Sequence, residues 1–175
     1  GSNLKNLIKF SLLKKSPIQV CFIVSNNIKS KGLNFAKKYK IKKKTYNFKN
    51  KKLSENLILR DLKKNKINLI CLAGFMKILS SNFIKKFNGN ILNIHPSLLP
   101  KYKGLNTHER IIKNNERFSG CTVHYVNSSL DSGKIILQKK ILVSKKDTPS
   151  TLKKKILKQE HLLYPKAINK LFSNL

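Results

Sequence analysis

The stretch ILNIHPSLLP, residues 91–100, decides how the middle of this 175-residue chain can fold. Its apolar start predicts a buried strand, and a loop bounded by Pro96 and Pro100 cannot continue that strand. Alternate side chains of a strand point to the same side, so Asn93 and His95 should lie next to each other at its end. The stretch therefore predicts a hydrogen-bond donor and a titratable imidazole together at the tip of a rigid element.

Two apolar runs precede this stretch, at residues 18–24 and 67–73, and each is typical of a buried parallel strand. Segments with helical spacing alternate with them along the chain. This alternation predicts an α/β fold with a mostly parallel, twisted sheet and helices on both faces. Ligands of such sheets bind beyond the carboxyl ends of the strands, where Asn93, His95 and residues 74–79 lie.

The other expected elements follow from spacing and turn residues. In the first half we expect a helix capped by Ser2 or Asn3, a helix over residues 29–39, a short strand over 45–48, a helix starting at Ser54, and a helix capped by Ser80 or Ser81. In the second half we expect a helix over residues 106–113, an antiparallel pair of strands over 121–126 and 135–143, and a last helix with Thr148 as its cap and Pro149 at its first position. Nothing reads as a linker or a repeat, so a single domain over residues 1–175 is expected.

Composition places the chain among globular proteins, because 40% of its residues are hydrophobic. No apolar run approaches the roughly 18 residues that a membrane helix needs, and the first residues show no signal-peptide pattern. We therefore expect a cytoplasmic protein without a membrane partner. The cysteines, Cys21, Cys71 and Cys121, are scattered, which indicates neither a disulfide framework nor a zinc site.

Charge is the most extreme property of the sequence: 38 Lys and Arg against 7 Asp and Glu give a formal net charge of +31. A nucleic-acid-binding protein is one explanation. However, dedicated nucleic-acid surfaces use arginine heavily, and only Arg60, Arg110 and Arg117 occur here. Lysines lie along nearly every predicted helix. This spread favours a genome-wide preference for AT-rich codons, rather than nucleic-acid binding, as the explanation of the charge. We expect no nucleic-acid partner, although the positive field would attract anionic substrates.

A catalytic site is the functional interpretation of residues 91–100. An amide and an imidazole side by side can stabilise an oxyanion. Asp131, in the loop expected over residues 127–133, could reach His95, fix its tautomer and favour its protonated form. None of these three groups is a hydroxyl or thiol nucleophile. The set therefore favours a reaction in which the substrate supplies the nucleophile.

The other histidines have separate interpretations. His108 lies near the start of a predicted helix and could line the cleft, His124 is expected to be a hydrogen-bonded core residue, and His161 stands beside Glu160 in the last helix. No pair of histidines has the spacing of metal ligands, so we expect no metal.

Five segments carry a resemblance to a known family: residues 72–80, 93–100, 104–108, 120–133 and 159–165. In order and spacing they closely resemble the phosphoribosylglycinamide formyltransferases, also called glycinamide ribonucleotide transformylases, over almost the whole chain. The resemblance implies their Rossmann-like formyltransferase fold. It also implies transfer of a formyl group from 10-formyltetrahydrofolate, as a co-substrate, to the amine of glycinamide ribonucleotide in de novo purine biosynthesis, without a metal.

The same resemblance assigns roles to individual residues. The catalytic residues are expected to be Asn93, His95 and Asp131. The ribonucleotide is expected to contact Gly1, Ser2, Asn3, Met76, Gln159 and Glu160. The folate is expected to contact main-chain groups of Lys77, Ile78, Leu79, Asn127, Ser128, Ser129 and Leu130.

Three features depart from the family pattern. Lys77 stands where the family often has arginine, and Ser128 stands where it usually has an acidic or apolar residue. The family also has a buried strand before the segment that Gly1, Ser2 and Asn3 match. We therefore expect an N-terminally truncated domain that lacks its first strand, with reduced stability and activity, as a monomer or a homodimer.

Three alternatives remain from the sequence. Formyltetrahydrofolate deformylase is similar and uses water as the nucleophile. Methionyl-tRNA formyltransferase resembles the loop at residues 97–100, but the chain leaves no room for a tRNA-binding domain. His95 and Pro96 together with residues 105–108 favour the ribonucleotide enzyme. The alternative from a different class is a basic nucleic-acid-binding module.

Overall fold

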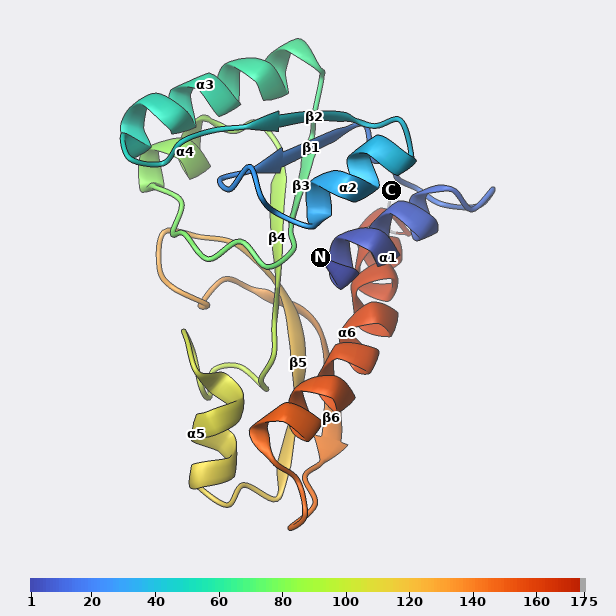
Figure 1. The fold of residues 1–175 in the computed structure, drawn as a ribbon, viewed down its shortest axis with the longest axis vertical. Coiled ribbons are helices and arrows are strands. Elements are labelled where there is room, and N and C mark those ends of the chain that lie inside the picture. Colours follow the sequence, from blue (N-terminus) through green and yellow to red (C-terminus); the bar gives the residue numbers. More distant parts are fainter. Residues whose placement is uncertain (174–175) are drawn as a thin grey trace. The chain divides into compact units, whose positions relative to one another are not determined.

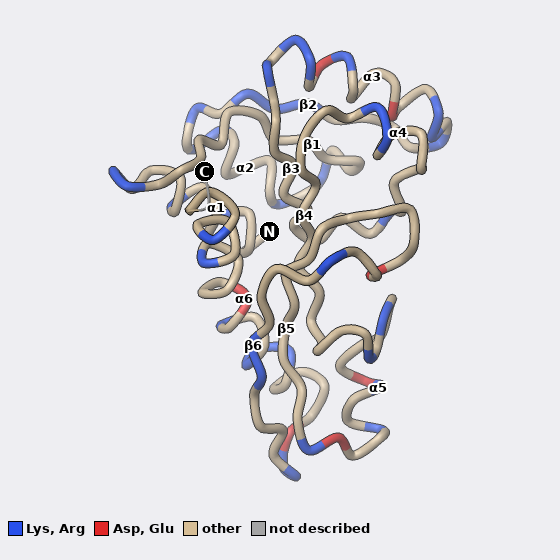
Figure 2. The backbone as a smooth tube through the Cα atoms, turned by 180° about the vertical axis from the view of Figure 1, so that it is seen from behind, with Lys and Arg blue, Asp and Glu red and all other residues tan. Residues whose placement is uncertain are grey.

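The computed structural model describes residues 1–173 and divides into two compact units, with the boundary between Ile91 and Leu92 (Figure 1). The strand β4 (Asn90–His95) crosses this boundary. Its first two residues belong to the first unit, and its last four belong to the second. Within residues 1–173, no helix is both long and apolar enough to cross a membrane. Lys and Arg occur on most helices of each unit, as Figure 2 shows.

The first unit alternates helices and strands, as predicted. Its elements are α1 (Ser2–Ser11), β1 (Phe22–Ser25), α2 (Gly32–Lys38), β2 (Lys42–Thr45), α3 (Lys51–Lys64), β3 (Leu69–Leu72) and α4 (Ser81–Lys86). β1 and β2 pair in parallel, with Phe22 beside Lys42. Ile8 of α1, Ile23 of β1 and Leu33 of α2 form a buried core against this pair. Each such side chain contributes roughly 1.5–3 kcal/mol by leaving water.

Three expectations for this unit are wrong in detail. The strand expected over residues 45–48 lies earlier, over β2, whose four residues are all exposed. Three of these residues are lysines, so the apolar pattern of a buried strand is absent. Gly1, which has no side chain to cap with, occupies the cap position of α1, in place of the expected Ser2 or Asn3. α3 begins before Ser54, because Asn50 caps it by accepting from the backbone N–H of Leu53.

The second unit is built on antiparallel strands. Its elements after β4 are α5 (Thr107–Lys113), β5 (Phe118–Tyr125), β6 (Ile135–Leu142) and α6 (Pro149–Phe172). The predicted antiparallel pair is confirmed as β5 and β6. β4 also pairs with β5 in the antiparallel sense, so the antiparallel part of the sheet begins one strand earlier than expected.

α6 packs along β5 and β6, as Figure 1 shows, and it buries one apolar face. The buried residues of this face include Leu152, Ile156 and Leu163, which recur at helical spacing. Thr148 caps the helix by accepting from the backbone N–H of Thr151, as predicted. Tyr164 is fully buried and donates a hydrogen bond of 3.1 Å to the carbonyl of Leu92 in β4. α6 is therefore hydrogen-bonded to β4 at the residue that precedes Asn93.

Candidate active site

Two of the predicted catalytic residues face partners on β5. In the antiparallel register Asn93 lies opposite His124, and His95 lies opposite Thr122. Residues opposite each other on antiparallel strands have their side chains within a few ångströms. The register therefore brings His124 to Asn93, and the two-residue spacing keeps Asn93 and His95 next to each other.

Asp131 completes the cluster from the loop that follows β5. Its Oδ2 lies 3.3 Å from Nδ1 of His95 and accepts a hydrogen bond of 2.9 Å from the backbone N–H of Gly104. Its Oδ1 lies 3.5 Å from Nδ2 of Asn93. Asp131 has a φ of 44°, in the left-handed region that Asp and Asn tolerate better than most residues. The loop thus brings Asp131 to His95, as the sequence predicted.

Both ring nitrogens of His95 face hydrogen-bond acceptors. Nε2 lies 2.8 Å from the carbonyl oxygen of Tyr102, and Nδ1 faces the carboxylate of Asp131. A carbonyl and a carboxylate accept but do not donate, so this geometry suits the imidazolium, in which both nitrogens carry a proton. The side chains of His95 and Asp131 are only 7% and 8% exposed. Water therefore screens the interaction between them only weakly.

His124 has the opposite character. Burial is the largest influence on it and lowers its pKa, so the neutral ring is favoured near neutral pH. Its Nδ1 lies 2.8 Å from the carbonyl of Tyr125 and so donates to it, which leaves Nε2 to accept from Nδ2 of Asn93 at 3.4 Å. The distance of 3.7 Å between His124 and Asp131 is then not an ion pair, because the neutral ring presents a lone pair there.

The cluster combines a fixed negative charge, a ring placed to carry a positive charge, and an amide. Asn93 makes only long contacts, of 3.4 and 3.5 Å, so its N–H groups can exchange them for a shorter bond to a substrate oxygen. Such a set can stabilise a developing oxyanion and relay a proton. Within residues 1–173, no three His, Cys, Asp or Glu side chains gather into a metal site.

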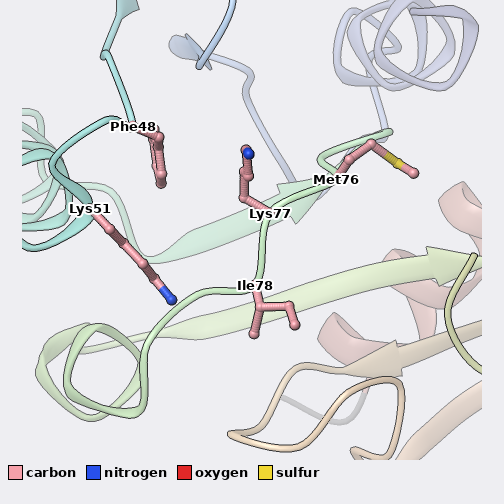
Figure 3. A pocket seen from close by; sticks show the side chains of 5 residues that line it. All are labelled: Phe48, Lys51, Met76, Lys77 and Ile78. Carbon is pink, nitrogen blue, oxygen red and sulfur yellow. The ribbon is translucent and has the colours of Figure 1, made fainter.

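The first unit has a cavity of about 370 Å³, which is lined by Phe48, Lys51, Met76, Lys77 and Ile78 (Figure 3). Three of these residues were expected to bind the ribonucleotide or the folate. Lys51 extends from α3 toward the segment at residues 76–78, so the cavity has a positively charged wall. Leu79, also expected at the folate, is 7% exposed, so its side chain belongs to the core.

Glu55 holds the end of this segment. It is 3% exposed and accepts hydrogen bonds from the backbone N–H and the hydroxyl of Ser80. Ser80 in turn caps α4 by accepting from the N–H of Phe83. The segment at residues 76–79 is therefore tied to a buried carboxylate of α3.

The remaining candidates lie in three places. In the first unit, Gly1, Ser2 and Asn3 form the start of α1. In the second unit, Asn127, Ser128, Ser129 and Leu130 form the exposed loop that leads to Asp131, and Gln159 and Glu160 lie on α6. In that loop, Oδ1 of Asn127 accepts from the backbone N–H of Ser129 and from the hydroxyl of Ser132. Glu160 is only 7% exposed.

Sequence reasoning missed three contributors to the cluster. His124 was expected to be a core residue, and it is buried, but it also contacts Asn93 and Asp131. The carbonyl of Tyr102 and the N–H of Gly104 are backbone groups, which leave no side-chain signature. Only the glycine itself, with a φ of 79°, hints at a special backbone position.

Comparison with known proteins identifies the family. The family model described as formyl transferase matches residues 1–168. The phosphoribosylglycinamide formyltransferase of Haemophilus influenzae is 39% identical over 173 residues, which cover 96% of this chain and 81% of that protein. The human trifunctional purine biosynthetic protein adenosine-3 is 40% identical over 171 residues, but the chain spans only 17% of its length.

A solved structure agrees with the sequence match. The crystal structure of phosphoribosylglycinamide formyltransferase from Anaplasma phagocytophilum superposes with a TM-score of 0.90 at 40% identity, over 96% of this chain and 79% of that one. The predicted α/β formyltransferase fold is thereby confirmed. The chain belongs to the formyl transferase family.

Proposed function

We propose that this protein transfers the formyl group of 10-formyltetrahydrofolate to the amine of glycinamide ribonucleotide, a step of purine synthesis. The observation that carries the proposal is the buried cluster of Asn93, His95 and Asp131. It offers an amide, a cation and a carboxylate but no side-chain nucleophile. A substrate amine fits that gap, and relatives of which the chain covers about four fifths are named phosphoribosylglycinamide formyltransferase.

The reaction proceeds by addition and elimination. The amine nitrogen of the ribonucleotide attacks the formyl carbon, and the carbonyl oxygen becomes an oxyanion. Asn93 donates to this oxygen, and the positive charge of His95 stabilises it. The bond from the formyl carbon to N10 of the folate then breaks. The proton lost by the amine reaches N10, so the products are the formylated ribonucleotide and tetrahydrofolate.

Asp131 has two tasks in this mechanism. Its Oδ2, 3.3 Å from Nδ1 of His95, keeps the ring oriented and favours its cationic form. Its other oxygen accepts only the long contact from Asn93, so it can take the amine proton, directly or through a water molecule. Binding both substrates in the correct orientation supplies much of the remaining rate enhancement.

The substrates are assigned to the residues that the sequence singled out. Gly1, Ser2 and Asn3 begin α1, and a helix N-terminus favours a phosphate group. Met76, Gln159 and Glu160 are assigned to the rest of the ribonucleotide. Main-chain groups of Lys77, Ile78 and Leu79 and of residues 127–130 are assigned to the folate. The cavity beside Met76 and Lys77, with the ammonium of Lys51 on its wall, suits an anionic, partly aromatic ligand.

The experiment is a spectrophotometric assay of tetrahydrofolate formation, with and without glycinamide ribonucleotide. Product that forms only with the ribonucleotide supports the proposal. Product at the same rate without it identifies a deformylase that uses water, and no product under either condition contradicts both activities. Deformylase activity has no specific observation in its favour, so it serves as an outcome of the test.

A further inference from the structure

The loop between β4 and α5 contains a residue in an unfavourable backbone conformation next to the catalytic histidine. Tyr102 has a φ of 57°, in the left-handed region that costs most non-glycine residues about 1 kcal/mol or more. Its carbonyl oxygen lies 2.8 Å from Nε2 of His95. A conformation of this kind persists only where the surrounding structure holds it, and such residues cluster at functional sites.

Three side chains hold Tyr102 in place. Its hydroxyl donates a hydrogen bond of 2.9 Å to Oε1 of Glu116 and accepts one of 2.9 Å from Nδ2 of Asn114. The guanidinium of Arg110 lies 5.3 Å from the centre of the tyrosine ring. Arg110 also donates to the carbonyl of Lys103, the next residue of the loop. All three side chains belong to α5 or to the turn that follows it.

The charge of Glu116 is itself secured. Its Oε1 accepts from Lys101 at 3.1 Å as well as from Tyr102, and these hydrogen bonds lower the pKa of its carboxyl group. Glu116 therefore stays ionised at any pH at which the enzyme is expected to work. The clamp on Tyr102 is present throughout that range.

We infer that Tyr102 is a positioning residue, whose clamped backbone carbonyl fixes the His95 ring by accepting from its Nε2–H. Two acceptors then oppose each other across one imidazole: the carbonyl of Tyr102 at Nε2 and the carboxylate of Asp131 at Nδ1. Together they hold the ring plane and favour a proton on each nitrogen. The carboxylate alone cannot do this, because a ring with one partner can turn about its side-chain bonds or change tautomer.

Other charged groups also act on His95, and the test has to separate them. Asp131 faces the ring from the loop after β5, and His108 of α5 and His124 of β5 are close enough to sense its charge. Lys103 lies in the same loop as Tyr102, and its positive charge acts on His124. Variants at Tyr102 leave all of these side chains unchanged, so an effect on His95 reports on the Tyr102 carbonyl.

The test compares Tyr102→Gly with Tyr102→Val. Both variants remove the ring and the hydroxyl, but glycine adopts a positive φ readily whereas a β-branched residue does not. In Tyr102→Val the ring-nitrogen NMR signals of His95 should change while those of His124 stay in place. Tyr102→Phe, which removes only the hydroxyl, should fold and show a smaller change in the same direction.

Activity provides a second readout, which rests on the proposed formyl transfer. Loss of a hydrogen bond to a charged group should lower kcat in Tyr102→Val by about tenfold to a hundredfold, with a smaller loss in Tyr102→Gly. A merely structural role would lower stability without the change in the ring-nitrogen signals of His95.

Unchanged His95 signals in a folded Tyr102→Val protein, or equal effects of valine and glycine, would overturn the inference. The NMR readout needs no turnover. If the wild-type protein fails to formylate glycinamide ribonucleotide but the His95 signals change as stated, the proposed function fails and the positioning role stands. If formyl transfer is present and the signals do not change, the positioning role alone fails.

Discussion

Oδ2 of Asp131 lies 3.3 Å from Nδ1 of His95 and is bonded at the same time to the backbone N–H of Gly104. The carboxylate is therefore oriented before any substrate arrives. Its two partners belong to different segments, a strand end and a loop. Asparagine has nearly the same shape as aspartate, so a substitution at this position tests the charge of Asp131 rather than its shape.

Replacing Asp131 by asparagine should lower the rate of formyl transfer by about a hundredfold or more, because the carboxylate that favours the cationic ring and accepts the amine proton is lost. Asparagine tolerates the left-handed φ of 44°, so the fold should persist. Steady-state rates and a thermal melt measure the two effects. Asp147→Asn, at the start of α6, is the matched control and should keep its rate. An active Asp131→Asn enzyme would rule out the proposed mechanism.

Asn93→Ala should lower kcat by about 10²-fold to 10³-fold, the usual effect of removing one oxyanion donor. Substrate KM values should change much less, because the donor acts mainly on the transition state. Asn90→Ala is the control on the same strand, since Asn90 is exposed. Stopped-flow or steady-state assays separate kcat from KM. Equal losses in the two variants would contradict the role of Asn93.

Stability should decrease as the pH falls from about 7.5 to 5.5. Burial lowers the pKa of His108, His124 and His161 below the ordinary value of 6.5. The unfolded chain then binds protons more readily than the folded one, so stability present above pH 6.5 is lost on acidification. The lowered carboxyl pKa values of Asp61 and Asp147 act only in more acidic solution. Urea midpoints across this range test the prediction, and a constant midpoint would refute it.

Glu55→Gln should lower the free energy of unfolding by about 1–3 kcal/mol, because one of the two buried oxygens that accept from Ser80 becomes a donor. Urea unfolding at neutral pH measures the loss. Glu109→Gln, at an exposed position of α5, is the matched control and should change stability little. If both variants unfold at the same urea concentration, the contact with Ser80 does not contribute to stability.

The three thiols should react at very different rates. Cys21 is exposed, whereas Cys121 is fully buried and its burial raises the pKa of its thiol to about 12. Thiolates rather than thiols react with aromatic disulfide reagents. Cys21 should therefore react first in the native protein, and Cys121 only after unfolding in urea. Cys21→Ser should abolish the fast phase. A fast phase that persists in this variant would show that Cys121 or Cys71 is reachable.

Side-chain patterns predicted the elements that they dominate. Spacing indicated the last helix, and Thr148 with Pro149 identified its start. The position of β2 was missed because its lysines, all exposed, pair through the backbone alone with β1. Pairing energy of that kind has no signature in side-chain hydrophobicity.

The same distinction applies to the site. Asn93, His95 and Asp131 could be proposed from residue types and a family resemblance. The cluster's backbone groups, the carbonyl of Tyr102 and the N–H of Gly104, could not, because every residue has such groups and only the loop conformation selects them. The antiparallel register that brings His124 to Asn93 also depends on pairing between distant segments.

The few carboxylates of this lysine-rich chain have a consequence for its tolerance of substitution. Glu55, Asp61, Glu116, Asp131 and Asp147 each have a specific hydrogen-bonded or ionic partner. Because the chain has only 7 acidic residues, it has no excess of carboxylates to replace one that is lost. A neutral residue at any of these five positions would leave a donor or a cation without its carboxylate, so these positions should tolerate substitution less well than the exposed lysines.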